Sequence, residues 1–484
     1  MPALCSELKL PKNINMFSLS DDILFLREDG QGRVALDIIA ILDNFSKLIH
    51  DFVGGPVLIA AILTTGIYLT VRSKFLQVRC FNLVLKETVF SIFQSEKSGK
   101  GEMSPFQALT TALAATIGTG NIAGVATAIT LGGPGAIFWM WVSAFFGMVT
   151  KYAEVVLAVH YRQKSQNGMV VGGPMYFLEY GLKKRFLAVM FALFGSLAAF
   201  GIGNMVQANS AADAVRQVFN IPPLVTGIAL SIATALVILG GIHRVAALTA
   251  KLVPLMSAFY VMGAFIILLR FADQIPGAFA AIIGNAFTGS AAVGGFAGAG
   301  VLQAFRFGVA RGIFTNEAGL GSASIAHAAA KTDHPARQGL WGIFEVFFDT
   351  HLVCTITAIT ILVTGVWIEG LEGASLTAAA FSRGLPGVGG YIVALSLIFF
   401  AFSTLVAWSF YGEKCYEYLA GTGSVILYRV IWILLIPVGA MGGLRTVWAL
   451  ADTLNGLMAI PNLIGLWGLS GVIMRLTREF FRRR

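Results

Sequence analysis

The sequence predicts an all-α polytopic membrane protein with eleven transmembrane helices. Of its 484 residues, 56% are hydrophobic and only 12% are charged, whereas soluble globular domains carry about 25% charged residues. The mean hydropathy is +0.77. Several apolar stretches reach the roughly 20 residues that a helix needs to cross the hydrocarbon core of a bilayer. A soluble protein cannot bury so many long continuous apolar segments, so the soluble fold classes are excluded.

The apolar windows give the eleven expected spans in chain order. They lie near residues 52–72, 105–131, 135–160, 185–204, 223–242, 246–270, 294–320, 339–366, 387–411, 424–443 and 446–475. The stretch 75–93 is apolar but carries three charged residues, which favours a helix at the membrane interface. Residues 274–288 are too short to span and are expected to re-enter the membrane or to lie flat on it. Pro461 is the expected position of a kink in the last span.

The distribution of Lys and Arg predicts the orientation. Basic residues gather in alternate loops and at the C-terminus, as in Arg72, Lys74, Arg79, Arg162, Lys164, Arg482, Arg483 and Arg484. The opposite loops hold only Arg216, Arg270, Arg383 and Arg445. Because cytoplasmic loops carry the excess of positive charge, the N-terminus is expected outside and the C-terminus in the cytoplasm. The net charge of +9 is explained by these loops, so nucleic-acid binding is not indicated.

Signatures of other protein classes are missing from the sequence. The four cysteines (Cys5, Cys80, Cys354 and Cys415) show no CxxC spacing, and the six histidines show no ligand spacing. No Walker A, GxSxG or HExxH pattern is present, so neither ATP-driven transport nor hydrolysis is indicated. We therefore expect no enzymatic activity and no cofactor. Residues 1–50 lack a signal-peptide pattern and are expected to form an extracytoplasmic tail.

The second span contains residues that do not suit a continuous helix. Gly118 and Gly120 flank Thr119, and Asn121 follows, at about the middle of the membrane. Glycine in a helix interior costs about 1 kcal/mol relative to alanine. A discontinuous helix uses such residues, because unwound carbonyls can bind a cation and free N–H groups can bind an anion. The alternative is a packing face of the GxxxG kind, which Gly120 and Gly124 fit but which does not explain the polar side chains.

The seventh span offers a counterpart. Residues 311–322 interrupt it with Asn316, Glu317, Gly319 and Gly321, five spans after the first interruption and from the opposite membrane face. Two interrupted helices at matching positions indicate an inverted-repeat transporter with its binding site between them. The alternative is that the two glycines end the helix before a cytoplasmic loop.

The sequence predicts five divisions of the chain. They are a tail (1–50), an extra first helix with an interfacial segment (51–104), a first five-helix repeat (105–271), a connecting segment (272–293), and a second repeat with a basic tail (294–484).

Polar side chains in two other spans are further candidates for the same site. Ser403 and Thr404 lie one turn before Trp408 in the ninth span. Hydroxyls in membrane helices usually bond their own backbone, so this pair is weak evidence by itself. Gln207 and Asn209, in the fourth span and its exit, could reach a substrate or could cap helices.

Ionisable residues inside predicted spans are functional suspects, because charge is costly in lipid. They are Lys151, Glu154, Arg306, Arg311, Glu317, Glu345 and Asp349. The alternative is a mutually neutralising structural network, which the spacing favours for Lys151 with Glu154 and for Arg306.

Four motifs resemble those of the sodium:alanine (alanine or glycine:cation) symporter family. They are GTGNIAGV at 118–125, GGPGAIFWMWVSAFFG at 132–147, GGPMYF at 172–177 and NEAGLGSA at 316–323. The resemblance runs from about residue 50 to the C-terminus. It implies a leucine-transporter-type fold of inverted five-helix repeats in a prokaryotic cytoplasmic (inner) membrane. It also implies sodium-coupled uptake of alanine or glycine.

By similarity to that fold, a substrate site can be assigned residue by residue. The substrate carboxylate is expected at the N–H groups of Thr119 and Gly120, where a half-helix begins. The substrate amine is expected to face main-chain carbonyls of Thr116, Phe314 and Thr315.

Three side chains are implied as the lining of this site. Asn121 is expected to face the substrate, whereas Trp408 and Phe314 would wall a pocket restricted to side chains as small as that of alanine. The remaining alternatives are a proton-coupled carrier, a glutamine or serine carrier of the same fold, and a channel with a continuous pore.

A sodium site is implied by the same resemblance. The ion is expected between the carbonyls of Ala114 and Ile117 and the hydroxyls of Ser403 and Thr404, because a hard cation prefers oxygen ligands. It would hold the unwound second span against the ninth span. Ion and substrate would then favour the same conformer, and each would raise the affinity of the other by the same factor.

Overall fold

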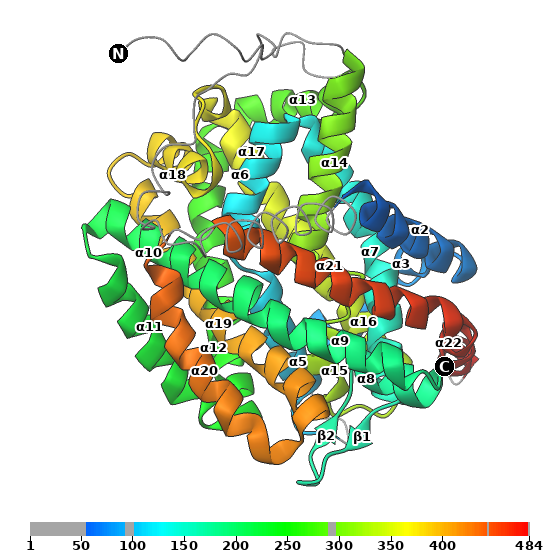
Figure 1. Cartoon of the computed structure of the whole chain (residues 1–484). Coiled ribbons are helices and arrows are strands. Elements are labelled where there is room, and N and C mark those ends of the chain that lie inside the picture. Colours follow the sequence, from blue (N-terminus) through cyan, green and yellow to red (C-terminus); the bar gives the residue numbers. More distant parts are fainter. Residues whose placement is uncertain (1–54, 92–100, 289–296, 443–444, 483–484) are drawn as a thin grey trace, which may run out of the picture. The chain divides into compact units, whose positions relative to one another are not determined.

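The computed structural model describes residues 55–91, 101–288, 297–442 and 445–482. All of them belong to the second of two compact units, Ile49–Arg484, and the tail predicted at 1–50 lies outside the described residues. The described chain is almost entirely helical (Figure 1). Its one regular sheet is a short antiparallel hairpin, β1 (Gln163–Lys164) with β2 (Val170–Val171), in which Gln163 pairs with Val171.

The helices of the first part run as follows. They are α2 (Pro56–Arg72), α3 (Leu76–Arg79), α4 (Phe81–Glu87), η1 (Val89–Ser91), α5 (Pro105–Thr116), η2 (Gly120–Gly124), α6 (Val125–Gly132), α7 (Gly135–His160), α8 (Pro174–Tyr176), η3 (Phe177–Gly181), α9 (Arg185–Ala198), η4 (Ala199–Met205), α10 (Val206–Phe219), α11 (Pro223–Ile238), α12 (Gly241–Arg270), η5 (Ala272–Gln274) and α13 (Ile275–Thr288).

The second part is equally helical. Its helices are α14 (Ala297–Asn316), α15 (Ser324–Ala328), α16 (Pro335–Val346), η6 (Phe347–Cys354), α17 (Thr355–Val363), η7 (Val366–Ile368), α18 (Gly373–Gly384), α19 (Gly389–Ala420), η8 (Thr422–Ser424), α20 (Val425–Ala440), α21 (Arg445–Gly468) and α22 (Ser470–Arg482).

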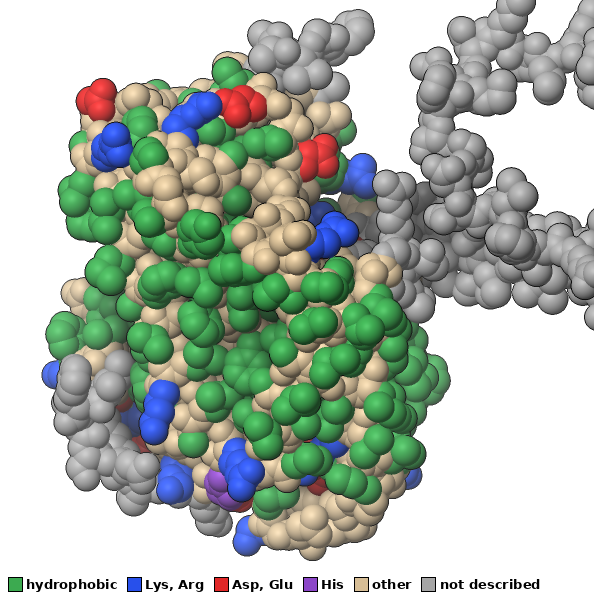
Figure 2. Space-filling view, turned by 90° about the vertical axis from the view of Figure 1, so that its left-hand side faces the viewer, with side chains coloured by type: hydrophobic (Ala, Val, Ile, Leu, Met, Phe, Trp, Pro, Cys, Tyr) green, Lys and Arg blue, Asp and Glu red, His purple; other side chains and the backbone are tan. Residues whose placement is uncertain are grey.

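Within the described residues, six helices are long and apolar enough to cross a membrane, and up to eight if each bent pair is one span. The six are Gly135–His160, Arg185–Phe219, Gly241–Arg270, Pro335–Val363, Gly389–Ala420 and Thr422–Ala440. Two shorter apolar helices, α2 and α11, accompany them. Large apolar side chains lie on the surface of several helices; Leu236 is 67% exposed and Leu434 is 65% exposed. Figure 2 shows such side chains across the middle of one face, between charged residues at both ends. The chain is therefore a multi-pass membrane protein.

The bend in the last span differs from the sequence prediction. Helix α21 passes through Pro461 without a break, and a bend of 60° comes instead between Gly468 and Ser470. The missing side chain of Gly468 lets Leu182 approach, since a Cβ there would lie 2.5 Å from its Cδ1. Leu469 turns into the core, with 5% of its surface exposed. Packing at the glycine, rather than the proline, sets the position of the bend.

Of the four π-helical segments in the described residues, η2, η4 and η6 lie within spans, and η2 contacts η6. Segment η2 contacts α14 and η6, while η4 contacts α19, α20 and α21. A π-helical turn widens the helix and often marks a functional site. The second and eighth spans therefore meet at π-helical turns beside α14, and the π-helical turn of the fourth span packs on the ninth.

Candidate functional site

The second span is broken as the sequence predicts. Helix α5 begins with a capping box: Gln107 N donates to Ser104 Oγ (3.1 Å), and Ser104 N donates to Gln107 Oε1 (2.9 Å). It ends at Thr116, and Ile117 leaves helical geometry with ψ of 87°. The helix resumes at Gly120 with its axis turned by 53°. The interruption of this span is confirmed.

Asn121 stabilises the break through its own side chain. Its Oδ1 accepts a hydrogen bond from Gly118 N (3.0 Å), and its Nδ2 donates to Asp349 Oδ1 in η6 (2.7 Å). Asn121 and Asp349 are both fully buried. The sequence predicts that Asn121 lines the substrate site. In the described structure its side chain makes hydrogen bonds with other residues of the protein. The sequence indicates a functional role for Asp349, because this residue is ionisable and lies in an apolar span. The sequence does not predict its hydrogen bond with Asn121.

The break releases two main-chain carbonyls. In a continuous helix Gly118 N would donate to Ala114 O, and Asn121 N would donate to Ile117 O. Here Gly118 N donates to the Asn121 side chain, and Asn121 N donates to Gly118 O (3.3 Å). The Ala114 and Ile117 carbonyls therefore lose their helical partners at a buried position.

The ninth span supplies hydroxyls beside one of these carbonyls. Thr404 Oγ1 donates to Ala114 O (2.9 Å), and Ser403 Oγ lies 3.4 Å from the same oxygen. Ser403 also donates to Phe400 O (2.9 Å), its own backbone, as the alternative interpretation expects. A Cβ at Gly118 would lie only 2.9 Å from Thr404 Oγ1, so glycine is what allows α19 to approach. Several oxygens without formal charge meet here, which suits a hard monovalent cation.

The other predicted substrate residues lie around the same break. Thr116 and Thr119 are each 3% exposed, and Thr116 Oγ1 lies 3.3 Å from Ala112 O in its own helix. A Cβ at Gly120 would lie 2.9 Å from Thr315 Cγ2 and 3.3 Å from Phe314 Cδ1. The end of α14 thus packs directly on the start of η2, and the structure brings these predicted residues together.

Gln207 places an unsatisfied acceptor at the break. Its Nε2 donates to Ile202 O (3.1 Å), but its buried Oε1 has no hydrogen-bond partner in the described structure. That oxygen lies 3.5 Å from the position of a Cβ at Gly118. A buried acceptor without a donor is costly, so this oxygen is available to accept a hydrogen bond at the break. Asn209, the accompanying candidate, contributes no described contact at the break.

The seventh span is interrupted as well. Helix α14 ends at Asn316, Glu317 adopts a left-handed conformation (φ 54°), and Gly319 and Gly321 follow with φ of 97° and 84°. The short helix α15 begins at Ser324, and the intervening residues are all buried. The glycines do come after the helix end, but the chain continues inside the protein rather than emerging as a surface loop.

Trp408 is fixed by contacts that the sequence did not reveal. Its Nε1 donates to Glu317 Oε1 (3.0 Å), and the other oxygen of that carboxylate accepts from Ser322 Oγ (2.5 Å). A Cβ added at Gly203 in η4 would overlap the Trp408 side chain. Trp408 is 1% exposed, so this indole is held between η4 and the turn after α14.

A buried charge network joins α7, α15 and α16. Lys151 Nζ is 3.3 Å from Glu345 Oε1, and His327 Nε2 is 2.9 Å from Glu345 Oε2. The direct partner of Lys151 is therefore Glu345 rather than Glu154. Glu154 Oε1 instead accepts from Gly319 N (2.9 Å) and from Asn462 Nδ2 (2.7 Å). This network anchors the second interruption to α7, α16 and α21.

Comparisons with known proteins show the family of the chain. Residues 39–484 match the model of the sodium:alanine symporter family. The sodium/alanine symporter AgcS of Methanococcus maripaludis is 52% identical over 453 residues, which cover 92% of this chain and 98% of that protein. The probable sodium/glutamine symporter GlnT of Bacillus subtilis is 38% identical over 92% of each chain. Among solved structures, a manganese transporter of Eremococcus coleocola aligns with a TM-score of 0.47 and 15% identity, over 77% of this chain and 78% of that one.

Proposed function

Because the chain belongs to the sodium:alanine symporter family, we propose that it is a secondary active transporter that couples sodium entry to uptake of alanine or glycine. The names of two relatives support sodium coupling, one with alanine and one with glutamine. The observation that carries the proposal is the break at residues 117–119, where freed carbonyls, two hydroxyls and the Gln207 acceptor meet. The protein would move its substrates by alternating access and would catalyse no covalent step.

In the proposed sodium site the ion replaces the hydrogen bond between Thr404 and Ala114. Its ligands would be the carbonyls of Ala114 and Ile117 and the hydroxyls of Ser403 and Thr404. Such an ion joins the end of α5 to α19, which belong to different repeats. The ion therefore stabilises the conformer that also holds the substrate, and coupling is reciprocal.

The proposed amino-acid site uses the second half of the broken helix. The substrate carboxylate would accept from the N–H groups of Thr119 and Gly120, where the positive end of the helix dipole lies. Gln207 Oε1 and the Thr116 carbonyl would accept from the amine. The remaining wall would consist of Asn121, Phe314, Thr315 and Trp408.

We propose a small substrate for this site. In the described conformation a methyl group on Gly120 would come within 3.3 Å of Phe314 Cδ1, so η2 and the end of α14 are closely packed where the substrate would bind. Together with the relative that is named a sodium/alanine symporter, this packing favours alanine or glycine as the substrate.

We further propose that α2, α11 and α14 cross the membrane with the eight spans counted above, which gives eleven. The helices of 105–271 and of 294–484 would form the two inverted five-helix repeats, and the connecting segment 272–293 includes α13. The N-terminus would lie outside and the C-terminus in the cytoplasm of a prokaryotic inner membrane, as the basic loops indicate.

Uptake of labelled alanine into proteoliposomes tests the proposal. A sodium gradient without a proton gradient should drive saturable uptake, whereas uptake driven by protons alone would favour the rival coupling. Unlabelled alanine and glycine should compete, and leucine should not. Saturation together with exchange of unlabelled substrate distinguishes a carrier from a channel.

The sodium site is tested by a matched pair of variants. Thr404→Ala removes the hydroxyl and should raise the sodium concentration for half-maximal uptake at least about tenfold, since a lost ligand costs 1.4 kcal/mol or more. Thr404→Ser keeps the hydroxyl and should behave like the wild type. Equal sodium dependence of the alanine variant and the wild type would refute the assignment.

A further inference from the structure

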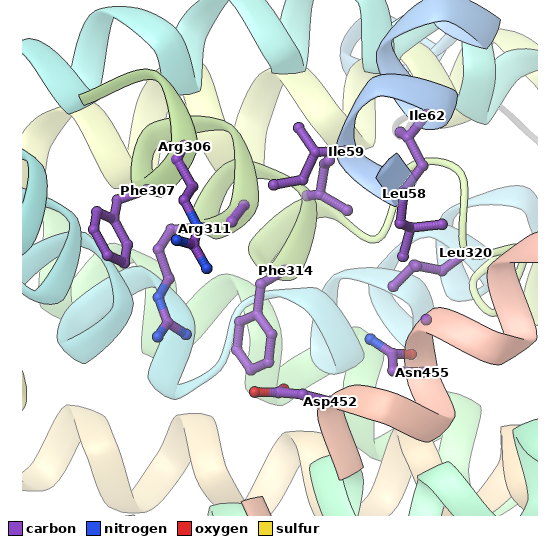
Figure 3. Close-up of a pocket in the computed structure, with 13 residues that line it drawn as sticks. Leu58, Ile59, Ile62, Arg306, Phe307, Arg311, Phe314, Leu320, Asp452 and Asn455 are labelled. Atoms are coloured by element: carbon purple, nitrogen blue, oxygen red, sulfur yellow. The ribbon is translucent and has the colours of Figure 1, made fainter. Parts of the chain in front are cut away.

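A partly open cavity lies beside the proposed substrate site. It has a volume of about 210 Å³ and is lined mainly by residues of α2, α14 and α21 (Figure 3). Phe314 forms part of its wall, and the same ring contacts the position of a Cβ at Gly120. This aromatic side chain therefore contacts both the cavity and the break in the second span. With the orientation proposed above, α14 enters from the outer face, so the cavity lies on the extracytoplasmic side of Phe314.

One wall of the cavity carries two cations. Arg306 and Arg311 of α14 both line it, and Figure 3 shows both side chains on the same side of the Phe314 ring. Their described contacts are with aromatic rings: Arg306 lies 5.8 Å from the Phe307 centroid, and Arg311 lies 5.7 Å from the Phe314 centroid. Within the described residues, neither guanidinium forms an ion pair. Two cations on one wall of a cavity favour the binding of an anionic group there.

The opposite wall carries groups that accept hydrogen bonds. Asp452 and Asn455, three residues apart on α21, both line the cavity. Asn455 is 8% exposed, and its buried Oδ1 has no hydrogen-bond partner in the described structure. A carboxylate beside an unsatisfied amide oxygen is complementary to an ammonium group. The two walls together therefore complement a zwitterion.

The volume fits a single small amino acid. A cavity of about 150 Å³ in another protein holds benzene, which has six non-hydrogen atoms. Alanine also has six non-hydrogen atoms, so the cavity of about 210 Å³ can hold it together with a little water. The cavity is thus large enough for the substrate class proposed above.

We propose that this cavity is a second, outer binding site for the amino-acid zwitterion on its way to the broken helix. The substrate carboxylate binds Arg306 and Arg311, and its ammonium group binds Asp452 and Asn455 Oδ1. This inference rests on the proposed function, because it takes the same substrate and adds a position where it waits outside Phe314. Two bound amino acids per chain follow from it.

Equilibrium binding of labelled alanine to the full-length protein in lipid nanodiscs, with sodium, tests the proposal. The wild type should bind two alanines per chain, and Arg306→Gln and Asp452→Asn should each bind one. The same variants in proteoliposomes should raise the alanine concentration for half-maximal uptake about tenfold while sodium dependence stays unchanged. Arg216→Gln is the matched control, because Arg216 pairs with Asp213 away from the cavity and should leave both measurements unaltered.

Asn455→Ala is a milder second variant, which removes only the unsatisfied acceptor and should weaken the second alanine with little effect on folding. Alaninamide, which lacks the carboxylate, should fail to compete for the outer site. One alanine per wild-type chain, or two in all the variants, would overturn the proposal while leaving sodium-driven uptake intact. If the wild type and all variants bind one alanine per chain, and labelled chloride binds to the wild type but not to Arg306→Gln, the cavity is an inorganic anion site instead. If the wild type neither binds nor transports alanine, the proposed function is refuted, and the outer site for alanine is refuted with it.

Discussion

The contact between the two interrupted helices can be tested with two equivalent substitutions. Gly120 and Gly124 lie one turn apart in η2, so replacing either with alanine changes helix propensity by the same amount. At position 120 the new methyl would lie 2.9 Å from Thr315 Cγ2, well inside the 3.5–4.0 Å of a normal carbon contact. At position 124 the nearest atom is Arg311 Cδ at 4.0 Å, which is ordinary contact. Only Gly120→Ala is therefore expected to push α14 away from η2.

The size of the effect follows from the overlap. Overpacking by one methyl group costs roughly 1–3 kcal/mol, and this cost falls on the conformer in which Thr315 and Phe314 pack on Gly120. Since 1.4 kcal/mol is a factor of ten, the population of that conformer should fall by about 5- to 150-fold relative to open ones.

Sodium-driven alanine uptake, normalised to the reconstituted protein, measures the consequence. Gly120→Ala should lower the ratio of maximal rate to half-saturating concentration at least about fivefold, whereas Gly124→Ala should stay within twofold of the wild type. A normal ratio in Gly120→Ala would refute the argument that the two helices must meet at this glycine. An equal loss in both variants would instead indicate that glycine is needed for helix geometry.

Three further substitutions probe buried polar contacts. Lys151→Met leaves Glu345 buried without its cation and should cost about 3–5 kcal/mol, seen as a lower thermal midpoint in detergent that Lys151→Met with Glu345→Gln partly restores. Gln207→Leu removes the unsatisfied acceptor, so alanine affinity in binding assays should drop about tenfold without loss of thermal stability. Asn121→Ala deprives Gly118 N and Asp349 of a partner and should cost about 1–3 kcal/mol in the same melting assay; an unchanged midpoint would contradict the structural role of this amide.

The interruption in the second span could be predicted from the sequence because its signal is local. Glycines and a buried asparagine in an apolar span oppose a continuous helix, whatever surrounds them. The end of the fourth span was not predictable in the same way. Apolar residues give way to Gln207, Asn209 and Asp213, yet the helix continues to Phe219. Gln207 and the small apolar residues of this extension are buried, whereas the side chains of Asp213 and Arg216 stay exposed, so mean hydropathy falls although the helix continues.

Partners distant in sequence were also beyond prediction. Spacing suggested that Lys151 pairs with Glu154, but Glu345 from α16 is the direct partner. The bond between Trp408 and Glu317 likewise depends on how α19 approaches the turn after α14. Sequence periodicity places a residue on its own helix, whereas the facing residue is decided by packing of the whole unit.

The binding of Gly319 has a mechanical consequence. Its N–H donates to Glu154 Oε1, its carbonyl accepts from Asn462 Nδ2, and that amide also donates to Glu154 Oε1. This closed triangle of bonds ties α7 and α21 to the turn after α14, so we expect the three to move together. The described tie of this turn to α19, by contrast, is the single bond from Trp408 to Glu317. If transport involves a rigid-body rotation of one group of helices against another, the interface between the two groups should run along α19. Spin labels on α7 and α21 should then keep a constant separation, while the distance between labels on α7 and α19 changes with sodium.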